Sequence, residues 1–253
     1  MKYIRHQECE VEINQQKIFA KSARLSASSN STEERVYGGE LRYYAASSPL
    51  SASVDFNYYI TGKEDFIGNL TGDFSCSGRF CGIEFSGAYL SNYSIKIEAY
   101  KPVEFNASFS IYSGYRGLTQ TGSFGGASTG LPNGAYTELL NFNQNSIGID
   151  FPQTINYDVE CERTPNYVIG SEFPEDVRYG TVRRKMSVGG ENIGSVINFS
   201  GRDFGEITVS PRNIDYAARG QTLKCKGIIN SQNLSISSNG LLAGSVEVME
   251  SLR

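Results

Sequence analysis

Histidine, the usual general base of hydrolytic enzymes, occurs once in this chain, as His6. Any Ser-His or Cys-His nucleophile would have to use it, because the imidazole must accept the proton of the hydroxyl or thiol. Its neighbours Arg5 and Gln7 and its place near a chain end indicate a solvated strand residue. Residues 126–130 read GASTG and match GxSxG, but a nucleophile elbow needs a strand before it and a helix after it. Both flanks are glycine-rich, so the sequence predicts no serine or cysteine hydrolase.

Carboxylates recur at every second position in two places, at Glu8, Glu10 and Glu12 and at Glu160 and Glu162. In a strand this spacing puts each set on one face, which is typical of a solvated sheet surface. Glycosidase chemistry instead needs two carboxylates that converge on a cleft. The chain also has no phosphate-binding loop, dinucleotide fingerprint or HExxH motif. We therefore expect a protein without catalytic residues or cofactors.

The five cysteines are an odd number and form no CxxC motif. The closest pair, Cys76 and Cys81, has no histidine nearby, and a zinc site would need more ligands at finger-like spacing. The pattern predicts buried free thiols in a reducing compartment and no metal site. The remaining cysteines are Cys9, Cys161 and Cys225.

The densest positive cluster is Arg183, Arg184 and Lys185, in a chain with net charge -4 and pI 5.2. Sequence-independent nucleic-acid binding depends on many Lys and Arg meeting phosphates, so an acidic chain is a poor candidate for it. On a strand the three side chains divide between two faces. We expect them to meet acidic groups of an adjacent subunit or loop.

The composition is that of a mainly β protein, with 16 Tyr, 14 Phe and 27 Gly. Apolar residues alternate in several segments, which predicts half-buried strands. The clearest hairpin joins 88–99 to 103–112 through a turn at 100–102, and residues 14–17 predict another tight turn. Short helices are expected only at 63–69 and 192–198. The chain has no apolar run long enough for a membrane helix, and its N-terminus lacks the apolar core of a signal peptide.

Two segments of the chain echo each other. Residues 17–40 align with 149–172 without a gap at a separation of 132, and 90–95 resemble 232–236 at a separation of 141. Such self-similarity indicates a tandem duplication. It predicts a first domain at 1–113, a glycine-rich linker at 114–138 and a second domain at 139–253.

Each copy carries a polar stretch at the same place, 28–34 and 160–166, which we predict to be an exposed loop. We expect these loops and the basic cluster to contact other subunits. The candidate contact residues are Ser29, Asn30, Ser31, Thr32, Arg163, Thr164, Pro165, Arg183, Arg184 and Lys185.

The second-copy stretch 157–174 (YDVECERTPNYVIGSEFP), followed by the basic strand 182–188, resembles the tail tube family of tailed bacteriophages. The stretch 87–95 (GAYLSNYSI), followed by 103–111, resembles the strand pair that closes such a domain. The resemblance implies two tandem tail-tube-like β-sandwich or split-barrel domains, each with a short flanking helix and a protruding loop. The glycine-rich segment 114–134 departs from the family pattern.

The resemblance also implies a function. The chain would be a virion structural protein, made in the host cytoplasm, whose homotrimers form pseudo-hexameric rings and stack into a tail tube. The rings would contact one another and other tail proteins, and DNA would pass without specific binding. Because the lumen must not hold phosphate, Glu8, Glu10 and Glu12 are the candidate lumen face.

Two other functions fit the sequence. A ring protein of the tail tip, baseplate or tail terminus would form one ring in place of a repeating tube. A β-sandwich glycan-binding or adhesion module would stack sugars on exposed tyrosines, for which the candidates are Tyr43, Tyr44, Tyr58 and Tyr59.

Overall fold

The computed structural model shows a mainly β chain, with no helix among the residues it describes. These residues are 11–18, 20–28, 31–35, 42–46, 51–59, 72–113, 115–117, 137–145, 148–149, 151–171, 173–191, 204–213, 222–236 and 242–252. The helices expected at 63–69 and 192–198 lie outside them. No helix of the described part could therefore cross a membrane.

The described strands fall into one large antiparallel sheet and a separate two-stranded hairpin, β4–β5. The strands are β1 (Val11–Ile13), β2 (Gln16–Lys17), β3 (Ala20–Ser28), β4 (Ser31–Arg35), β5 (Arg42–Ala46), β6 (Ser51–Tyr59), β7 (Cys76–Phe80), β8 (Ile83–Glu98), β9 (Glu104–Ile111), β10 (Tyr115–Gly117), β11 (Thr137–Asn145), β12 (Pro152–Asn166), β13 (Asp176–Glu191), β14 (Phe204–Asn213), β15 (Leu223–Ile236) and β16 (Leu242–Leu252).

The predicted period-2 alternation is confirmed where strands pack on the core. In β6 the side chains of Val54, Phe56 and Tyr58 are buried, while their neighbours are half-buried. In β12 the same holds for Ile155 and Val159. One face of each strand thus joins the core and the other stays polar.

Two of the hairpin turns have two residues, both in the left-handed region. Asn14 and Gln15 join β1 to β2 with φ of 48° and 67°, and Cys81 and Gly82 join β7 to β8 with φ of 48° and 83°. Positive φ at both central residues matches the right-handed twist of the flanking strands. The predicted tight turn at 14–17 is confirmed, as is the hairpin of β8 with β9. Strands β7 and β8 form a further hairpin around Cys81.

Strand β8 changes partners along its length. Its first part, 83–88, pairs with β7 on one side, and its second part, 92–98, pairs with β12 on that same side. Gly87 lies just before this change, at the register shift of the β7–β8 pair, with φ of +58°. A Cβ atom there would lie 2.1 Å from the Ser113 hydroxyl, so the bend requires glycine both for its φ and for space.

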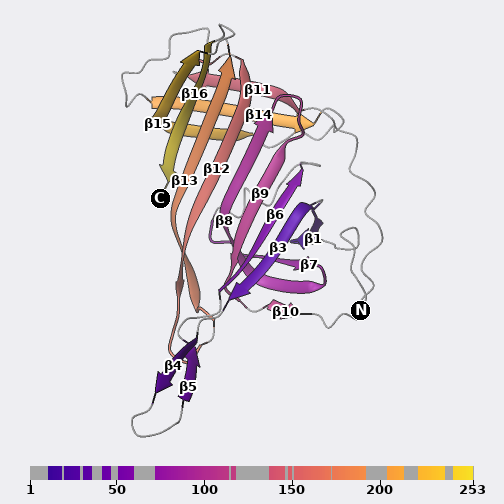
Figure 1. The fold of residues 1–253 in the computed structure, drawn as a ribbon, viewed down its shortest axis with the longest axis vertical. Coiled ribbons are helices and arrows are strands. Elements are labelled where there is room, and N and C mark those ends of the chain that lie inside the picture. The colour runs from indigo at the N-terminus through magenta and orange to yellow at the C-terminus, as the bar shows by residue number, and fades with distance from the viewer. Residues whose placement is uncertain are drawn as a thin grey trace.

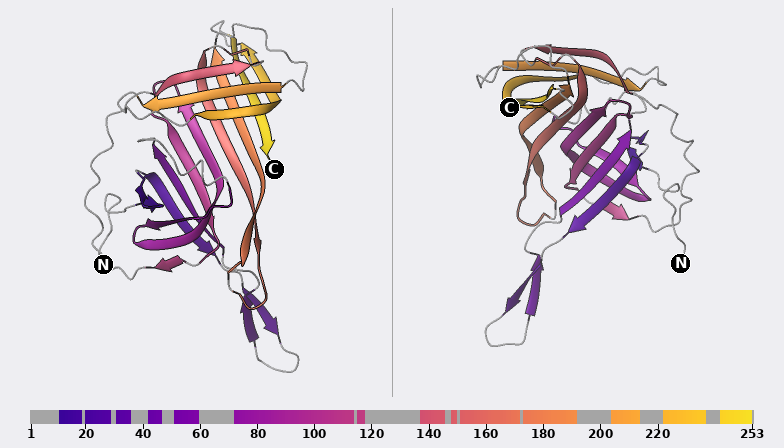
Figure 2. Two further views of the ribbon diagram at one scale, coloured as in Figure 1. Left: turned by 180° about the vertical axis from the view of Figure 1, so that it is seen from behind. Right: turned by 45° about the horizontal axis from the view of Figure 1, so that its top comes forward.

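Short strands cross the long ones and enclose the core (Figures 1 and 2). The hairpin of β7 with the start of β8 lies across β3, β6 and β9, and β11 and β14 run across β12, β13 and β16. Buried side chains from both layers form one apolar cluster. Among them are Ile13, Phe56, Phe85, Phe109, Met186, Val188, Val209, Cys225 and Val248.

The prediction of exposed loops at 28–34 and 160–166 is wrong. Residues 31–35 form β4, and 160–166 are the end of β12, paired with β13 as far as Asn166 opposite Asp176. The turn follows at 167–175. Both segments belong to ribbons that extend from the body of the molecule (Figure 1), although Cys161 at the start of the second is still part of the core.

The cysteines are only partly as expected. Cys76, Cys161 and Cys225 are free and buried, which confirms the prediction for these three. Cys81 is disulfide-bonded, so the prediction of free thiols is wrong there. Burial raises the pKa of Cys76 and Cys225 to about 12, which keeps both thiols protonated and unreactive.

Candidate assembly interface

The described strands contain the same order twice. The first set runs β3–β6–β9–β8–β7–β1 and the second runs β12–β13–β16–β15–β14–β11, with each neighbour hydrogen-bonded to the next. In each set the third, fourth and fifth strands are consecutive in the chain and pair as neighbours: β9–β8–β7 in the first set and β16–β15–β14 in the second. The sets meet where β8 of the first pairs with β12 of the second.

The register of the first strand pair repeats as well. Ala23 lies opposite Phe56 in β3–β6, and Ile155 lies opposite Val188 in β12–β13, so both partners differ by 132 (155 minus 23 and 188 minus 56). The β-bulges also match. One lies between Ala20 and Ser22, and the other between Pro152 and Thr154, again 132 residues on. Because a bulge is a local irregularity, its recurrence at one separation is more specific than strand order.

A second bulge repeats at another separation. In β8–β9 the register shifts between Leu90 and Asn92, and in β15–β16 it shifts between Ile229 and Ser231, a difference of 139 (229 minus 90). The opposite residues, Phe109 and Val248, differ by the same number. The sequence echo of 90–95 with 232–236 was aligned at a separation of 141. It is therefore two residues out of the register that the structure shows.

The junction between the two sets is a fully packed strand pair. Ile155 lies opposite Ile97 and Tyr157 opposite Ile95, and all four side chains are buried. On the other face Thr154 lies opposite Glu98, and no like charges face each other directly. This pairing joins eight strands into one long sheet, β3–β6–β9–β8–β12–β13–β16–β15.

Glu98 at this junction is expected to titrate far below an ordinary glutamate. The Lys101 ammonium donates to its carboxylate, and Lys96 lies 2.5 Å away on the other oxygen, which together lower the pKa of Glu98 from 4.5 to about 2. A lowered carboxyl pKa stabilises the fold above pH 4.5, and this contribution is lost as the pH falls through about 2. An NMR titration of the side-chain carboxyl carbon should show it, and Lys101→Ala should move the midpoint upward. A midpoint of 4.5 in the parent protein would contradict the arrangement.

The two ends of the long sheet are unpaired in the described part of the chain. β3 pairs with β6 on one side only, and residues 230–236 of β15 pair with β16 on one side only. Leu234 is 46% and Ile236 is 73% exposed there, whereas Ile95 and Ile97, which occupy the same places in β8, are 1% and 4% exposed. The difference arises because β12 covers Ile95 and Ile97, whereas no described strand covers Leu234 and Ile236.

The basic cluster is neutralised by the chain itself. Arg183 and Lys185 point to one face and Arg184 to the other, as the strand position predicts. Their acidic partners lie on neighbouring strands: Glu160 at 3.6 Å from Arg183, Glu250 at 3.7 Å from Arg184 and Glu247 at 2.8 Å from Lys185. The expected acidic groups are thus present within the same sheet, and contacts of these residues with another subunit stay a prediction.

The other candidate contact residues are divided. Glu8, Glu10, Ser29 and Asn30 lie outside the described residues, and Ser31 and Thr32 are described only as backbone of β4. Arg163, Thr164 and Pro165 lie on β12, in strand pairing with Tyr179, Arg178 and Val177 of β13.

Arg163 packs against its own chain. Its guanidinium stacks over the rings of Tyr179 and Tyr89, 5.0 Å and 5.6 Å from their centroids, and its Nε donates to the Leu90 carbonyl at 3.3 Å. Such stacking is characteristic of arginine. This residue therefore fastens β12 to β8, next to the junction, in addition to any contact it makes elsewhere.

The turn beyond Pro165 exposes apolar side chains that the sequence did not single out. Ile169 is fully exposed, and Val168 and Phe173 are partly exposed beside it. Exposed apolar groups gathered at the tip of a projecting hairpin indicate a protein contact.

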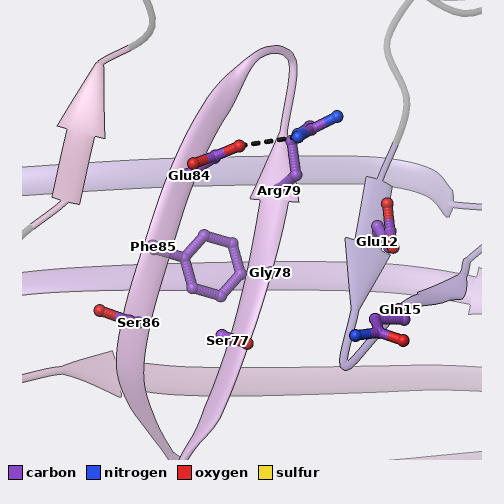
Figure 3. A pocket seen from close by; sticks show the side chains of 8 residues that line it. All are labelled: Glu12, Gln15, Ser77, Gly78, Arg79, Glu84, Phe85 and Ser86. Carbon is purple, nitrogen blue, oxygen red and sulfur yellow. Dashed lines mark hydrogen bonds and ion pairs between the residues drawn. The ribbon is translucent and has the colours of Figure 1, made fainter.

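A pocket with a volume of about 450 Å³ lies beside the β7–β8 hairpin (Figure 3). Arg79 and Glu84 form an ion pair of 2.7 Å at its edge, and the Phe85 ring covers Gly78. Glu12 lines the same pocket. No nucleophile–base pair occurs here, and the described residues contain no metal-binding cluster.

The structure shows the surroundings of two further candidate residues, Tyr58 and Glu12. Tyr58, proposed for sugar stacking, is buried and stacks on Phe105 with ring centroids 5.4 Å apart, so it is not available to a glycan. Glu12 lies on β1, which pairs with β7 in the crossing layer. It therefore does not share the polar face of the long sheet.

No protein-family model matches the sequence, and no curated protein matches it.

Proposed function

We propose that this chain is a structural subunit of a phage tail, built from two tandem tail-tube-like units, whose copies form rings that stack into a tube for DNA. One observation carries the proposal. The strand order, the register and two bulges recur at fixed separations, and the first unit hydrogen-bonds to the second through β8 and β12. A chain whose own two units join edge to edge can add further units in the same way. Such head-to-tail contacts close into a ring when the rotation permits.

The face of the long sheet that no described strand covers supports a channel. Its opposite face is covered by the crossing strands, so only this face could line a lumen. Asn57 donates to Asn106 at 2.7 Å, and Asn106 donates to Ser94 at 3.2 Å, which gives a neutral polar ladder across three strands. A surface of this kind offers phosphate little to bind.

Four cations on this face have acidic partners. Lys21 lies 2.9 Å from Glu104, Lys96 lies 2.5 Å from Glu98, and Arg183 and Lys185 contact Glu160 and Glu247. We accordingly assign the lumen to this face and no longer to the face of Glu8, Glu10 and Glu12, since Glu12 belongs to the crossing layer. The proposed role needs neither a catalytic residue nor a cofactor, and it places the protein in the virion.

The projecting hairpins support stacking between rings. In Figure 1 the β4–β5 hairpin and the far end of β12–β13 extend from the same end of the molecule. They also correspond in the repeat, because adding 132 to the bounds of β4 gives 163–167, the end of β12 and its turn. The exposed Ile169 at the tip of one hairpin would be covered by the next ring.

Negative-stain electron microscopy of the purified protein tests the proposal. Hollow tubes with a regular axial repeat support the tube subunit. Single rings of one size support the related role, a ring protein of the tail tip, baseplate or tail terminus. A protein that stays monomeric at all concentrations, with or without binding to a glycan array, overturns both.

A further inference from the structure

We infer that neighbouring copies join by antiparallel pairing of β3 in one copy with residues 231–236 of β15 in the next, with Leu25 opposite Leu234. We call this contact the seam. The inference rests on the proposed function, because it assumes that the chain assembles with itself. It goes further in naming the two edges and their register.

The occupant of each free edge follows from the junction inside the chain. In the repeated order, β3 corresponds to β12 and β15 corresponds to β8. β12 occupies one side of β8. In the repeat, the corresponding side of β15 is free beyond Ile228, since β14 pairs only with 223–228. The side of β12 that β8 occupies is likewise the free side of β3. Each free edge therefore corresponds to a strand edge that is already paired at the junction. By the same correspondence, the free edge of β3 is the partner of the free edge of β15.

The two edges belong to different copies. Within one chain they lie at opposite ends of the long sheet, separated by six intervening strands. The β3 that meets β15 must then come from a second molecule.

The register follows from the two repeat separations. In the junction Ile155 lies opposite Ile97, and Tyr157 lies opposite Ile95. Subtracting 132 from the β12 residue and adding 139 to the β8 residue gives Ala23 opposite Ile236 and Leu25 opposite Leu234. On the polar face the same step places Arg24 opposite Ser235.

The side chains at the seam are complementary in this register. Leu234 and Ile236 are exposed, and Ala23 and Leu25 are half-buried, so pairing would cover all four on the core face. On the polar face the only charge is that of Arg24, opposite a serine, so no like charges meet. Natural proteins protect open sheet edges with charges or proline, but residues 230–236 (NSQNLSI) contain neither. An edge without such protection is expected where pairing is intended.

A disulfide-trapping experiment tests the strands and the register together. The variant Arg24→Cys/Ser235→Cys places two thiols directly opposite each other across the seam, at the Cβ separation that a disulfide requires. The matched control Arg24→Cys/Asn233→Cys moves one thiol by two residues on the same exposed face. Mild oxidation of the purified proteins is followed by non-reducing electrophoresis, and the single variants correct for the native cysteines.

We expect covalent oligomers from the first variant, at least about tenfold more than from the control, because a diagonal Cβ pair lies about 7–8 Å apart. A single largest cross-linked species indicates a closed ring. A ladder without an upper limit supports the seam but overturns the ring. Rings or tubes without the cross-link overturn the seam and leave the proposed function standing. Equal cross-linking in both variants overturns the register, and no cross-link at any concentration overturns the seam.

Discussion

A Leu234→Asp variant is expected to fold like the parent protein and to lose assembly. In the single chain Leu234 is 46% exposed, so a carboxylate there stays hydrated and costs the fold little. At the seam it would lie opposite Leu25 on the core face, where an unpaired buried charge costs several kcal/mol. A cost of about 3 kcal/mol weakens association about 100-fold. Sedimentation velocity over a concentration series measures the shift, and circular dichroism checks the fold.

The matched control for this prediction is Phe74→Asp. Phe74 is a large apolar side chain at the surface, 66% exposed, and lies just before β7, on neither strand of the seam. It should leave assembly unchanged, which separates the effect of the seam from a general loss of surface hydrophobicity. If Leu234→Asp assembles at the parent concentration, β15 is not the contact edge.

A Gly227→Ala substitution is expected to have the largest effect on stability. Gly227 lies in β15, and a Cβ atom there would lie 2.0 Å from the carbonyl oxygen of Met249 and 2.7 Å from its carbonyl carbon. These atoms belong to the backbone of β16, so no side-chain rotation relieves the contact and the two strands must move apart. We expect a loss of about 3 kcal/mol, at the upper end for overpacking, and a fall in Tm of about 10 °C. Thermal unfolding followed by circular dichroism at 218 nm, roughly the β-sheet minimum, measures it.

The control is Gly180→Ala, also a strand glycine. There the nearest atoms to the added Cβ are the Glu162 Oε2 at 2.9 Å and the Glu162 Cβ at 3.0 Å, so the carboxylate can rotate away and only the contact between the two Cβ atoms must widen, by a few tenths of an ångström. Its Tm should change by no more than about 3 °C, since a strain of 1 kcal/mol or less is expected. Equal Tm shifts for Gly227→Ala and Gly180→Ala would show that the contact of β15 with β16 is looser than the structure indicates.

Much of the strand framework could be predicted from the sequence. Alternation located β6, β9 and the buried half of β12, because one face of each packs on the core and the other meets water. The polar residues at 14–17 located one tight turn, which the structure shows at Asn14 and Gln15. Where the apolar alternation ended, prediction failed. Residues 160–166 still alternate in exposure, with Cys161 buried and Arg163 and Pro165 half-buried, but the half-buried positions hold no large aliphatic side chain, so the hydrophobic pattern is lost.

The candidate site could be predicted only in part. The basic cluster was identified, and its division between two faces follows from strand geometry, but its partners Glu160, Glu247 and Glu250 come from two strands distant in sequence. The exposed Leu234 and Ile236 gave no signal at all, since an apolar residue at alternating spacing reads as core. They are exposed because no described strand pairs with this part of β15 on its outer side.

The amino-acid sequence by itself determined that the chain is mainly β, where most strands lie, and that one segment recurs 132 residues later. These are local properties, because periodicity and turn chemistry act over a few residues. The tertiary structure alone decided that β8 pairs with β12, that the second separation is 139, and that β3 and the end of β15 are the free edges. The reason is that strands pair through backbone hydrogen bonds, which are the same for every residue type. The choice of partner depends on long-range packing, and a one-residue bulge resets the register without leaving a mark in the sequence.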